Sequence, residues 1–598
     1  MMHSLAIVLF QSHNNLFMRR LFLHAGMLVL IANVAMQAQT SVRIPEPITH
    51  APAEERYRVY LAPDGNDANS GVRISPVLSF ARAIAVLKER TSDAQGRVPC
   101  AFRFLSGEYA LQSNFIQRAE DYKVTGPAGT RFLDLSLEGE GFTILDASKI
   151  TITPGHGVFT LCGRGITVSN IVIRNSSEFG IRLGQPGYRC TNVLLKKVII
   201  DGTYSHGIKI GDETSALSDT TMLQHCTVRN TNLMNIRGEK GQFGSAIKMF
   251  GAHDVIVDSC FVERNWGEAV CINNSQRVEV RNTTIIDNWG PAVYCDVASD
   301  VRIHGNVFKS NEDTTMFPRG HRGMVGVLLS AEAWDGSRTD YFTERIDVYN
   351  NVFLNMAGCL DIWEGAVGFL QRQIIRDVRF AHNTCIGMWT TQGNTSTAFV
   401  NAVYSSPFPA NRTISKIRVA NNIFSVSPLK VAPKLWVRLP AEIIPAFTYP
   451  NNYWRTEVPG IGTTFSNVIN TSLPETEPAS LYPSATPSLR GRVPSTPGID
   501  HDARGLQRER DSTNAGAFEW ERESNVLESD DSESILSSYM VYGQSYVIAA
   551  QQSAYTISVY CLDGRMISTC YVLSGEKSTV VWGETRQAII CLQRRKSR

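Results

Sequence analysis

The feature that most constrains this sequence is a near-repeat at a step of 23 residues. The tripeptide Asn-Trp-Gly at 265–267 returns at 288–290. Segments of alternating apolar residues, each followed by a turn, extend the pattern and begin at residues 166, 193, 255, 278, 301, 346, 378 and 417. Apolar residues at every second position predict strands. Short strands recurring every ~20 to 50 residues predict a β-solenoid, in which each coil buries its apolar side chains only by stacking on the next coil.

An asparagine recurs at one place in four of these segments, as Asn306, Asn351, Asn383 and Asn422. Asparagine tolerates a left-handed or bridging bend and can hydrogen-bond to its equivalents in other coils. Because stacked coils place like residues on like, we expect these side chains to form an asparagine ladder.

Composition sets limits on the rest of the chain. With 598 residues, 43% of them hydrophobic, there is room for one long domain and a smaller module. Lys and Arg number 58 against 56 Asp and Glu, which gives no reason to expect a nucleic-acid partner. The cysteines of the repeat segments contain no Cys-x-x-Cys pair, so we expect buried free thiols rather than a zinc site.

Two further stretches mark the ends of the repeat region. The first, at 57–90, reads YRVYLAPDGNDANSGVRISPVLSFARAIAVLKER, and the second, at 498–520, reads GIDHDARGLQRERDSTNAGAFEW. Together with the repeats they resemble the secreted right-handed parallel β-helix superfamily of pectate-lyase-like proteins over residues 57–520. The resemblance implies an all-β solenoid whose open N-terminal end is capped by a helix at 80–90.

The remaining segments predict export. Residues 18–38 combine two arginines, an apolar run and small residues near Ala38, which is the pattern of a secretory signal peptide that starts at Met18. No other stretch is long and apolar enough to span a membrane, so we expect no membrane-spanning segment after cleavage. We expect a secreted protein, either extracellular or attached to the outer-membrane surface.

The C-terminal part changes character after Trp520. Residues 521–538 are acidic and Ser-rich, as linkers are, and residues 539–598 alternate like a small β-sandwich. The strand ISVYCLDGRMIS resembles the C-terminal sorting domain of the Bacteroidota type IX secretion system, which would make that machinery a partner. The alternative is a β-sandwich appendage without a sorting role.

Candidate functional residues emerge when the strand after each turn is aligned. In GIRLG at 180, GIKIG at 207, AIKMF at 246 and their equivalents, the second and fourth residues are apolar, so the third and fifth should point away from the core. The third positions are Arg182, Lys209, Lys248, Cys271, Tyr294, Leu328 and Asp361, and the fifth positions include Asn273, Asp296 and Trp363. Coils ~4.8 Å apart would space these groups about as sugar rings are spaced in an extended chain.

The cations at the start of this column favour an anionic ligand. Arg182, Lys209 and Lys248 would repel one another as a bare stripe on a solvated face. The structural alternative is an ordinary sheet surface with interleaved counter-ions such as Asp212 and Glu213.

Insertions interrupt the repeat at 231–245, 309–325, 331–343, 364–375 and 388–413, and we expect these loops to wall the column into a groove. One of them carries a second cationic cluster, Arg319, His321 and Arg322. Exposed tryptophans such as Trp363 could stack on sugars, although Trp266 and Trp289 also suit packing within a turn.

Three chemistries fit such a column. A polyuronate lyase would use Lys248, Tyr294 and Lys209, with Arg182 or a Ca²⁺ ion neutralising the substrate carboxylate. A glycoside hydrolase would use two carboxylates from among Asp296, Asp361, Glu364 and Glu268. A noncatalytic adhesin would need only polar and aromatic groups that bind a glycan. The lyase ranks first because the cationic row is the feature least easily explained by structure, and the predicted ligand is an acidic polysaccharide bound by Arg182, Trp363, Glu364, Arg319, His321 and Arg322.

Overall fold

The computed structural model describes most of the repeat region and the strands of the C-terminal module. The described residues are 44–46, 57–90, 99–118, 134–212, 218–233, 244–311, 315, 323–333, 337–365, 370–388, 398–404, 408–425, 437–454, 469–470, 493–503, 505–508, 513–518 and six strands between 535 and 594. The predicted signal peptide at 18–38 lies outside them. By contacts the chain divides into two compact units, residues 1–520 and 521–598.

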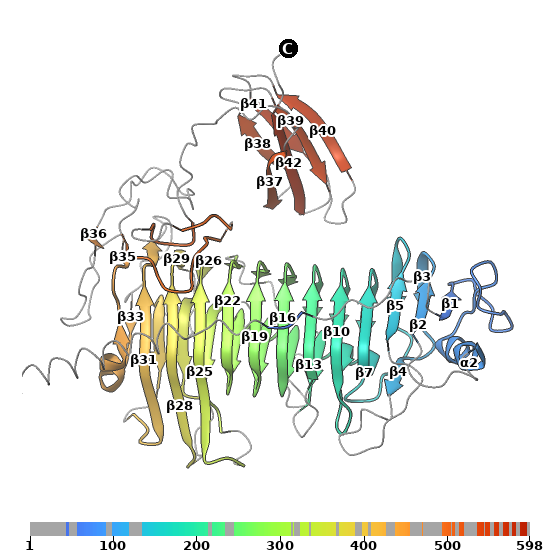
Figure 1. Cartoon of the computed structure of the whole chain (residues 1–598), viewed down its shortest axis with the longest axis horizontal. Coiled ribbons are helices and arrows are strands. Elements are labelled where there is room, and N and C mark those ends of the chain that lie inside the picture. The colour runs from blue at the N-terminus through green and yellow to red at the C-terminus, as the bar shows by residue number, and fades with distance from the viewer. Residues whose placement is uncertain are drawn as a thin grey trace, which may run out of the picture. The chain divides into compact units, whose positions relative to one another are not determined.

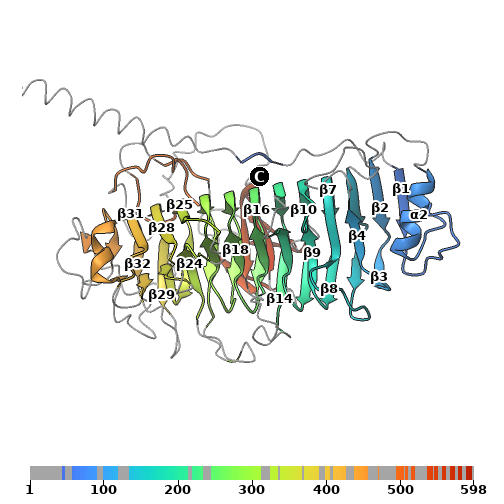
Figure 2. The same ribbon diagram turned by 90° about the horizontal axis from the view of Figure 1, so that it is seen from below.

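The first unit is a right-handed parallel β-helix, as the repeat predicted. Successive coils stack in one row from β1 to β33 (Figures 1 and 2), and all strand pairs between coils are parallel, each strand joining its equivalent in the next coil, as β12 joins β15 and β15 joins β18. One turn of the solenoid contributes one strand to each of three faces, called here sheets 1, 2 and 3.

Sheet 1 holds β4 (Phe115–Arg118), the first half of β7 (Gly157–Ser169), β9 (Phe179–Leu183), β12 (Ile208–Gly211), β15 (Ile247–Phe250), β18 (Val270–Asn273), β21 (Val293–Asp296), β24 (Val325–Ser330), β27 (Gly358–Trp363), β30 (Val400–Val403) and β33 (Val437–Arg438). Sheet 2 holds β1 (Tyr57–Leu61), β2 (Cys100–Phe104), β5 (Leu135–Gly139), the second half of β7, β10 (Cys190–Lys196), β13 (Ser218–Gln224), β16 (Ala252–Asp258), β19 (Gln276–Arg281), β22 (Ser299–His304), β25 (Asp340–Tyr349), β28 (Arg372–Ala381), β31 (Arg412–Ala420) and β34 (Phe447–Thr448).

Sheet 3 holds β3 (Gly107–Ala110), β6 (Thr143–Asp146), β8 (Val172–Ser176), β11 (Ile199–Thr203), β14 (Thr227–Thr231), β17 (Phe261–Glu263), β20 (Thr284–Ile286), β23 (Val307–Lys309), β26 (Val352–Met356), β29 (Thr384–Met388), β32 (Ile423–Ser425), β35 (Tyr453–Trp454) and β36 (Ile469–Asn470). A 3-10 helix, η3 (Ala441–Ala446), lies between β33 and β34.

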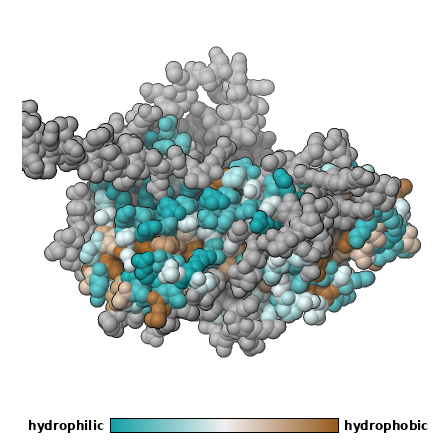
Figure 3. All heavy atoms as spheres, turned by 60° about the horizontal axis from the view of Figure 1, so that its bottom comes forward, coloured by the Kyte–Doolittle hydropathy of each residue, from teal (hydrophilic) through white to brown (hydrophobic). Residues whose placement is uncertain are grey.

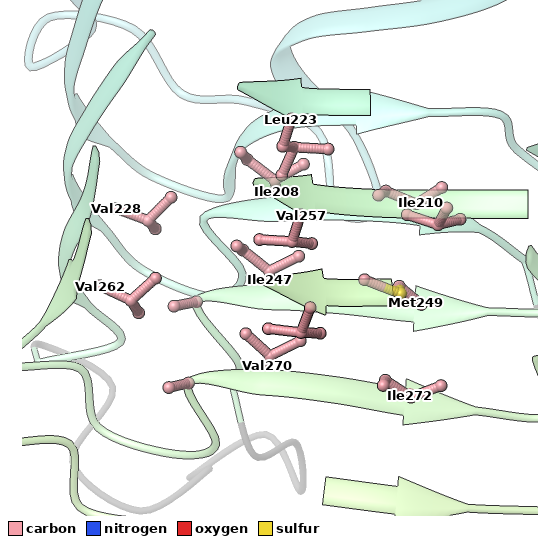
Figure 4. Close-up of a cluster of buried hydrophobic side chains, with 14 of the residues drawn as sticks. Ile208, Ile210, Leu223, Val228, Ile247, Met249, Val257, Val262, Val270 and Ile272 are labelled. Carbon is pink, nitrogen blue, oxygen red and sulfur yellow. The ribbon is translucent and has the colours of Figure 1, made fainter. Parts of the chain in front are cut away.

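The core is a stack of aliphatic side chains contributed by all three sheets. Figure 4 shows Ile208, Ile247 and Val270 aligned in successive coils of sheet 1, facing Leu223 and Val257 of sheet 2 and Val228 and Val262 of sheet 3. All seven are fully buried. The alternation read from the sequence therefore assigns the inward positions correctly.

The helix expected at 80–90 is present as α2 (Phe80–Arg90), beside β1 at the N-terminal end of the stack (Figure 2). Its buried residues Phe80, Ala83, Val86 and Leu87 belong to the same core as the strands. Basic residues in its last turn, Lys88 and Arg90, suit the negative end of the helix dipole. The helix thus covers apolar side chains that the first coil would otherwise expose.

The predicted asparagine ladder is confirmed and is longer than expected. Each side-chain amide donates to the next, from Asn306 to Asn351 (2.9 Å), Asn351 to Asn383 (3.0 Å), Asn383 to Asn422 (3.1 Å) and Asn422 to Asn452 (2.9 Å). The left-handed conformation, one of the two bends expected for these asparagines, belongs instead to the residue before each one, Gly305, Asn350, His382 and Asn421. The preceding residue turns the backbone so that the ladder amide can point inward and satisfy buried backbone groups.

The segment at 498–520 closes the repeat region by packing against sheet 3. The Ala517 amide donates to Thr384 Oγ1 (2.9 Å), and Arg508 donates to Asn350 Oδ1 (2.7 Å). Ala517 and Phe518 also form a small apolar cluster with Val352. The nine cysteines in the described part of the chain are buried and are not joined in disulfides, as predicted.

The second unit has two antiparallel sheets. One has the order β37 (Ile535–Tyr542), β42 (Gln587–Arg594), β39 (Tyr555–Tyr560) and β40 (Met566–Val572), and the other pairs β38 (Ser545–Ala549) with β41 (Lys577–Val581). The expected sandwich is thus present, but β37 begins inside the segment 521–538 that we predicted to be linker. The sequence pattern missed the start of this strand because it is rich in serine. In the structure, Ser537 and Ser538 pair with Leu592 and Cys591 on β42.

Hydrophilic side chains form a band along the side of the chain drawn in Figure 3, with smaller apolar areas between them. No helix in the described part of the chain is long and apolar enough to cross a membrane.

Candidate functional site

The predicted column exists on sheet 1, and its residues are in register. The pairings run from Arg182 to Lys209, Lys248, Cys271, Tyr294, Leu328 and Asp361, each opposite the next in adjacent coils. The fifth positions form a second row that pairs Asn273 with Asp296 and Asp296 with Ser330. Aligning the strand that follows each turn predicted this register, although the step is 23 residues only from Lys248 to Cys271 and from Cys271 to Tyr294.

The expectation that this column faces solvent is wrong. Arg182, Tyr294, Asp296 and Asp361 are 4%, 6%, 1% and 2% exposed, and Lys248 is half-buried. None of these side chains belongs to the apolar core cluster. They lie on the outer side of sheet 1 and shield one another, so their charges act at short range and with little screening by water.

The first cation of the row has an internal partner. Arg182 forms an ion pair with Asp212 and donates to the carbonyl oxygen of Gly155, and its Nε donates to Gly184 O (2.9 Å). These contacts favour the structural alternative for Arg182, with Asp212 as the counter-ion named for it. Its guanidinium carbon and the ammonium of Lys209 lie 5.7 and 5.9 Å from the centre of the Phe179 ring, which stabilises both charges.

His206 lies beside these cations and stays neutral. Burial lowers its pKa well below the usual value, and the positive charges of Lys209 and Lys248 lower it further. Its Nδ1 accepts a hydrogen bond from the Ser245 backbone amide (2.9 Å). Nδ1 is therefore unprotonated, and His206 acts as a packed neutral ring under the column.

Lys248 is held by neutral groups. Its ammonium donates to Cys271 Sγ (3.2 Å) and to Asn273 Oδ1 (2.5 Å). Burial lowers its pKa, but Cys271, Glu268 and Asp296 oppose that effect and the net result is a raised pKa. Lys248 is therefore a cation at neutral pH with one ammonium proton beyond those two bonds.

Asn273 connects Lys248 to a pair of carboxylates. Its amide donates to Asp296 Oδ2 (2.8 Å), and Asp296 Oδ1 accepts from the backbone amide of Glu332 (2.7 Å). The hydroxyl of Tyr294 donates to Glu332 Oε1 (2.6 Å). These five residues form one hydrogen-bonded network, called here the carboxylate network: Lys248, Asn273, Tyr294, Asp296 and Glu332.

The carboxylate network holds its protons tightly. Burial raises the pKa of Asp296 to about 7, and the negative charge of Glu332 adds to the effect. Burial, with a contribution from Glu268, also raises the pKa of Glu332. The pKa of Tyr294 rises well above its usual value because the phenol is buried beside both carboxylates. An acid whose pKa lies near neutrality can both give and take a proton, which is what acid–base catalysis requires.

Glu332 is the functional candidate that the sequence reasoning missed. It lies two residues beyond the end of β24, at the start of the insertion 331–343, and the column alignment considered only residues within strands. The sequence signal that could have identified it is its position two residues after β24, the strand that pairs with the Asp296 strand β21. Glu332 is also half-buried, unlike Asp296, so it is the outward member of the pair.

Three other predicted residues lie further along sheet 1. Asp361 is buried and accepts a hydrogen bond from Asn401 (3.2 Å). Trp363 is 39% exposed and pairs in register with Val403. Glu364 is half-buried and influences the pKa of Arg412, whose burial lowers it. Asp361 and Trp363 lie on β27, two coils beyond Asp296, and Glu364 follows them directly.

The tryptophan pair, the cationic loop and the Ca²⁺ site are the remaining predictions. Trp266 and Trp289 pack on each other with ring centres 4.3 Å apart, and Trp266 is 4% exposed, so packing within the turn accounts for this pair. Arg319, His321 and Arg322 lie outside the described residues. Among the residues that are described, no group of three or more His, Cys, Asp or Glu is arranged to hold a metal ion, so a Ca²⁺ requirement stays a prediction.

Comparison with known proteins agrees with the fold. The family model of the right-handed β-helix region matches residues 187–367, and a comparison with curated proteins finds no match. The chain is therefore a right-handed parallel β-helix protein by its strand topology, and this family model covers the coils that carry the carboxylate network.

Solved structures with the same kind of fold include enzymes and an adhesin. Pectate lyase Pel9A is 12% identical, with 78% of this chain and 97% of that chain covered and a TM-score of 0.35. PfbA, a surface adhesin of Streptococcus pneumoniae, is 11% identical, with 66% and 90% covered and a TM-score of 0.40. The catalytic unit of a GH87 alpha-1,3-glucanase from Streptomyces thermodiastaticus is 10% identical, with 73% and 72% covered and a TM-score of 0.37. At these values function must be argued from the site itself.

The raised pKa of Asp296 predicts a particular pH dependence of stability. An unfolded Asp ionises near pH ~4, whereas folded Asp296 keeps its proton to about pH 7. The unfolded state therefore binds fewer protons between these values, and stability must fall as the pH rises through them. We expect Asp296→Asn to remove this loss, so that its free energy of unfolding relative to the wild type increases by ~2 to 4 kcal/mol from pH 4 to pH 7.

Denaturant unfolding of both proteins at several pH values measures this difference. Comparing variant with wild type cancels the opposite contribution of Glu279, whose pKa is lowered to about 2 by the hydrogen bond from His304 and by neighbouring arginines against the effect of burial. A difference that does not change with pH would show that Asp296 ionises normally.

Proposed function

We propose that this chain is an exported protein that cleaves glycosidic bonds in an acidic extracellular polysaccharide, with the carboxylate network as its acid–base centre. The single observation that carries the proposal is the hydrogen-bonded arrangement of Asp296, Glu332 and Tyr294 beside the Lys248 ammonium. Two carboxylates with different environments are what glycoside hydrolysis needs. Lys248 provides the positive charge that favours an acidic sugar.

Each group has a role that its surroundings support. Glu332 is the half-buried member of the pair and would protonate the glycosidic oxygen. Asp296 is more deeply buried, and the charge of each carboxylate would affect the proton affinity of the other. Glu268 is the candidate for the opposite carboxylate, because it is half-buried, hydrogen-bonded to Ser245 Oγ (2.8 Å), and close enough to influence the pKa values of both Lys248 and Glu332. Tyr294 positions Glu332 through its hydrogen bond.

The lyase hypothesis now ranks second. A lyase needs a group that removes a proton next to the substrate carboxylate. Lys248 and Tyr294, the residues first assigned to this step, both have raised pKa values and keep their protons at neutral pH. Lys248 remains suited to the other task of a lyase, which is neutralising the substrate carboxylate, and Asp296 would then be the base.

A panel of polymers separates these chemistries. The purified chain is incubated with polygalacturonate, alginate, hyaluronan and a neutral glucan, and both reducing ends and ultraviolet absorbance are followed. Hydrolysis predicts new reducing ends without new absorbance, whereas elimination gives an unsaturated, absorbing sugar. Binding without product would favour the adhesin, and neither binding nor product with any acidic polymer would contradict the proposal.

For the second unit we propose the role of a type IX sorting domain, on the resemblance of its central strand. Deleting residues 539–598 should leave the protein in the periplasm of a type IX-competent host, because the machinery has lost its signal. The purified deletion variant should keep the unfolding midpoint of the first unit, since the chain divides into compact units at residue 520. Normal surface delivery of the shortened chain would refute this role.

A further inference from the structure

Sheet 1 changes in chemical character on the two sides of the carboxylate network. On the N-terminal side, the Lys248 ammonium reaches Asn273, one coil before Asp296. On the C-terminal side, the outer positions of β24 are Leu328 and Ser330, and those of β27, two coils beyond β21, are Asp361 and Trp363. Two coils correspond to about 10 Å, or roughly two sugar rings of an extended chain.

Lys248 is suited to a carboxylate-bearing sugar next to the reacting bond. Two of its three ammonium protons point at the neutral acceptors Cys271 Sγ and Asn273 Oδ1. A substrate carboxylate could accept the third proton without breaking an existing ion pair. Since the site is largely shielded from water, such a contact would be strong and selective for an anion.

Trp363 is suited to an uncharged sugar face. It is one of the few large apolar side chains that the described part of the chain exposes, at 39%. Flat aromatic rings bind the apolar faces of other rings and gain from burying that area. Glu364 follows it directly, and Asp361 lies on the same strand, so a second carboxylate here would meet negative charge. Arg412, which influences both Glu364 and Glu332, offsets only part of it.

We propose that sheet 1 binds a mixed polysaccharide in a fixed register, placing an acidic sugar against Lys248 and an uncharged sugar on Trp363, on opposite sides of Glu332. This inference rests on the proposed function and narrows its substrate class. A polymer in which uronates alternate with neutral amino sugars satisfies both ends, whereas a homopolymer of uronates places a carboxylate beside Glu364. Because the bond to be cleaved lies between the two subsites, the chain is cut internally.

The test compares two polymers and two variants of the full chain. Hyaluronan is the mixed probe and polygalacturonate the all-acidic probe, with affinity measured by electrophoresis through gels that contain each polymer and cleavage measured by reducing ends and product size. We expect at least tenfold tighter binding to hyaluronan. Trp363→Ala should weaken hyaluronan binding at least fivefold while changing polygalacturonate binding less than twofold, and Lys248→Met should weaken both at least tenfold.

Matched controls come from outside sheet 1. Phe142→Ala removes another exposed aromatic side chain, 68% exposed, and Lys416→Met removes an exposed lysine of sheet 2. Both should leave binding and cleavage unchanged. The inference of an acidic and an uncharged subsite is wrong if hyaluronan is cleaved but Trp363→Ala binds it as Phe142→Ala does, or if polygalacturonate binds more tightly than hyaluronan. The proposed function would then still stand. If no polymer is cleaved by the wild type, the proposed function itself fails and the inference fails with it.

Discussion

Replacing Ile247 by Asp should prevent the first unit from folding stably. Ile247 is fully buried between Ile208 and Val270 of the neighbouring coils, and its backbone amide and carbonyl are already committed to the strand ladder. A carboxylate at this place would have no partner and no water, and the coils on both sides would lose their aliphatic contact. We expect a loss of ~5 kcal/mol or more, which is exceptional for one substitution.

The matched control is Lys196→Asp, which introduces the same side chain at an exposed strand position of sheet 2. It should change the free energy of unfolding by less than ~1 kcal/mol. Circular dichroism and denaturant unfolding of the full chain give both values. Similar losses for Ile247→Asp and Lys196→Asp would mean that the inward position of Ile247 on sheet 1 and the outward position of Lys196 on sheet 2 are assigned wrongly.

The second large effect concerns catalysis. Glu332→Gln removes the carboxyl group of the half-buried proton donor while keeping a side chain of the same size. Asp296→Asn does the same for the buried carboxyl group in the network. We expect each to lower kcat by ~10²- to 10⁴-fold, the usual range for an acid–base group, with little change in KM. Because the two carboxylates share one network, the double variant should be hardly worse than either single variant.

The conservative variant Tyr294→Phe separates positioning from proton transfer. It removes the hydrogen bond to Glu332 Oε1 without removing a carboxylate, so the pKa of Glu332 should rise. Because Glu332 must be protonated to act as the donor, the basic limb of the pH–rate profile should move to higher pH. Unchanged kcat in Glu332→Gln, under conditions where the wild type is active, would exclude Glu332 from the reaction.

Much of the fold could be predicted because the repeat carries its own register. The step that relates Asn265 to Asn288 also relates Cys271 to Tyr294 and Asn273 to Asp296, and all three relations appear in the structure. The asparagine ladder followed from the shared place of Asn within its strand-and-turn segments, although its steps are longer, 45 residues from Asn306 to Asn351 and 32 from Asn351 to Asn383. These features depend on local pattern and on stacking between neighbouring coils, which a single sequence displays directly.

Other features depended on contacts that the pattern does not encode. Asp296 and Arg182 are buried, with polar partners such as Asn273 and Asp212 beside them. An alternation of apolar and polar residues cannot distinguish a solvated face from a shielded polar one. Glu332 was missed because it follows a strand and lies at the start of an insertion, where the repeat gives no register. Its place beside Tyr294 is a tertiary contact between residues 38 apart.

The assignment of the acid–base role to the carboxylates, rather than to Lys248, also depends on contacts between residues distant in sequence. From the sequence alone, a lysine in a cationic row is a candidate base. In the structure, the neighbouring Cys271, Glu268 and Asp296 keep its pKa high, and burial moves the pKa of Asp296 to about 7. Proton affinities are set by burial and by neighbours in space, so the roles of residues in the column could be assigned only from the folded chain.

The measurement that tests the account most directly is a crystal structure of the Glu332→Gln variant with a hyaluronan oligosaccharide. We expect the oligosaccharide to run along sheet 1, with a glycosidic oxygen within hydrogen-bond distance of residue 332 and a sugar carboxylate in contact with the Lys248 ammonium. An oligosaccharide bound on sheet 2 or sheet 3, or bound on sheet 1 with its glycosidic oxygens remote from residue 332, would contradict the assignment of the carboxylate network as the acid–base centre.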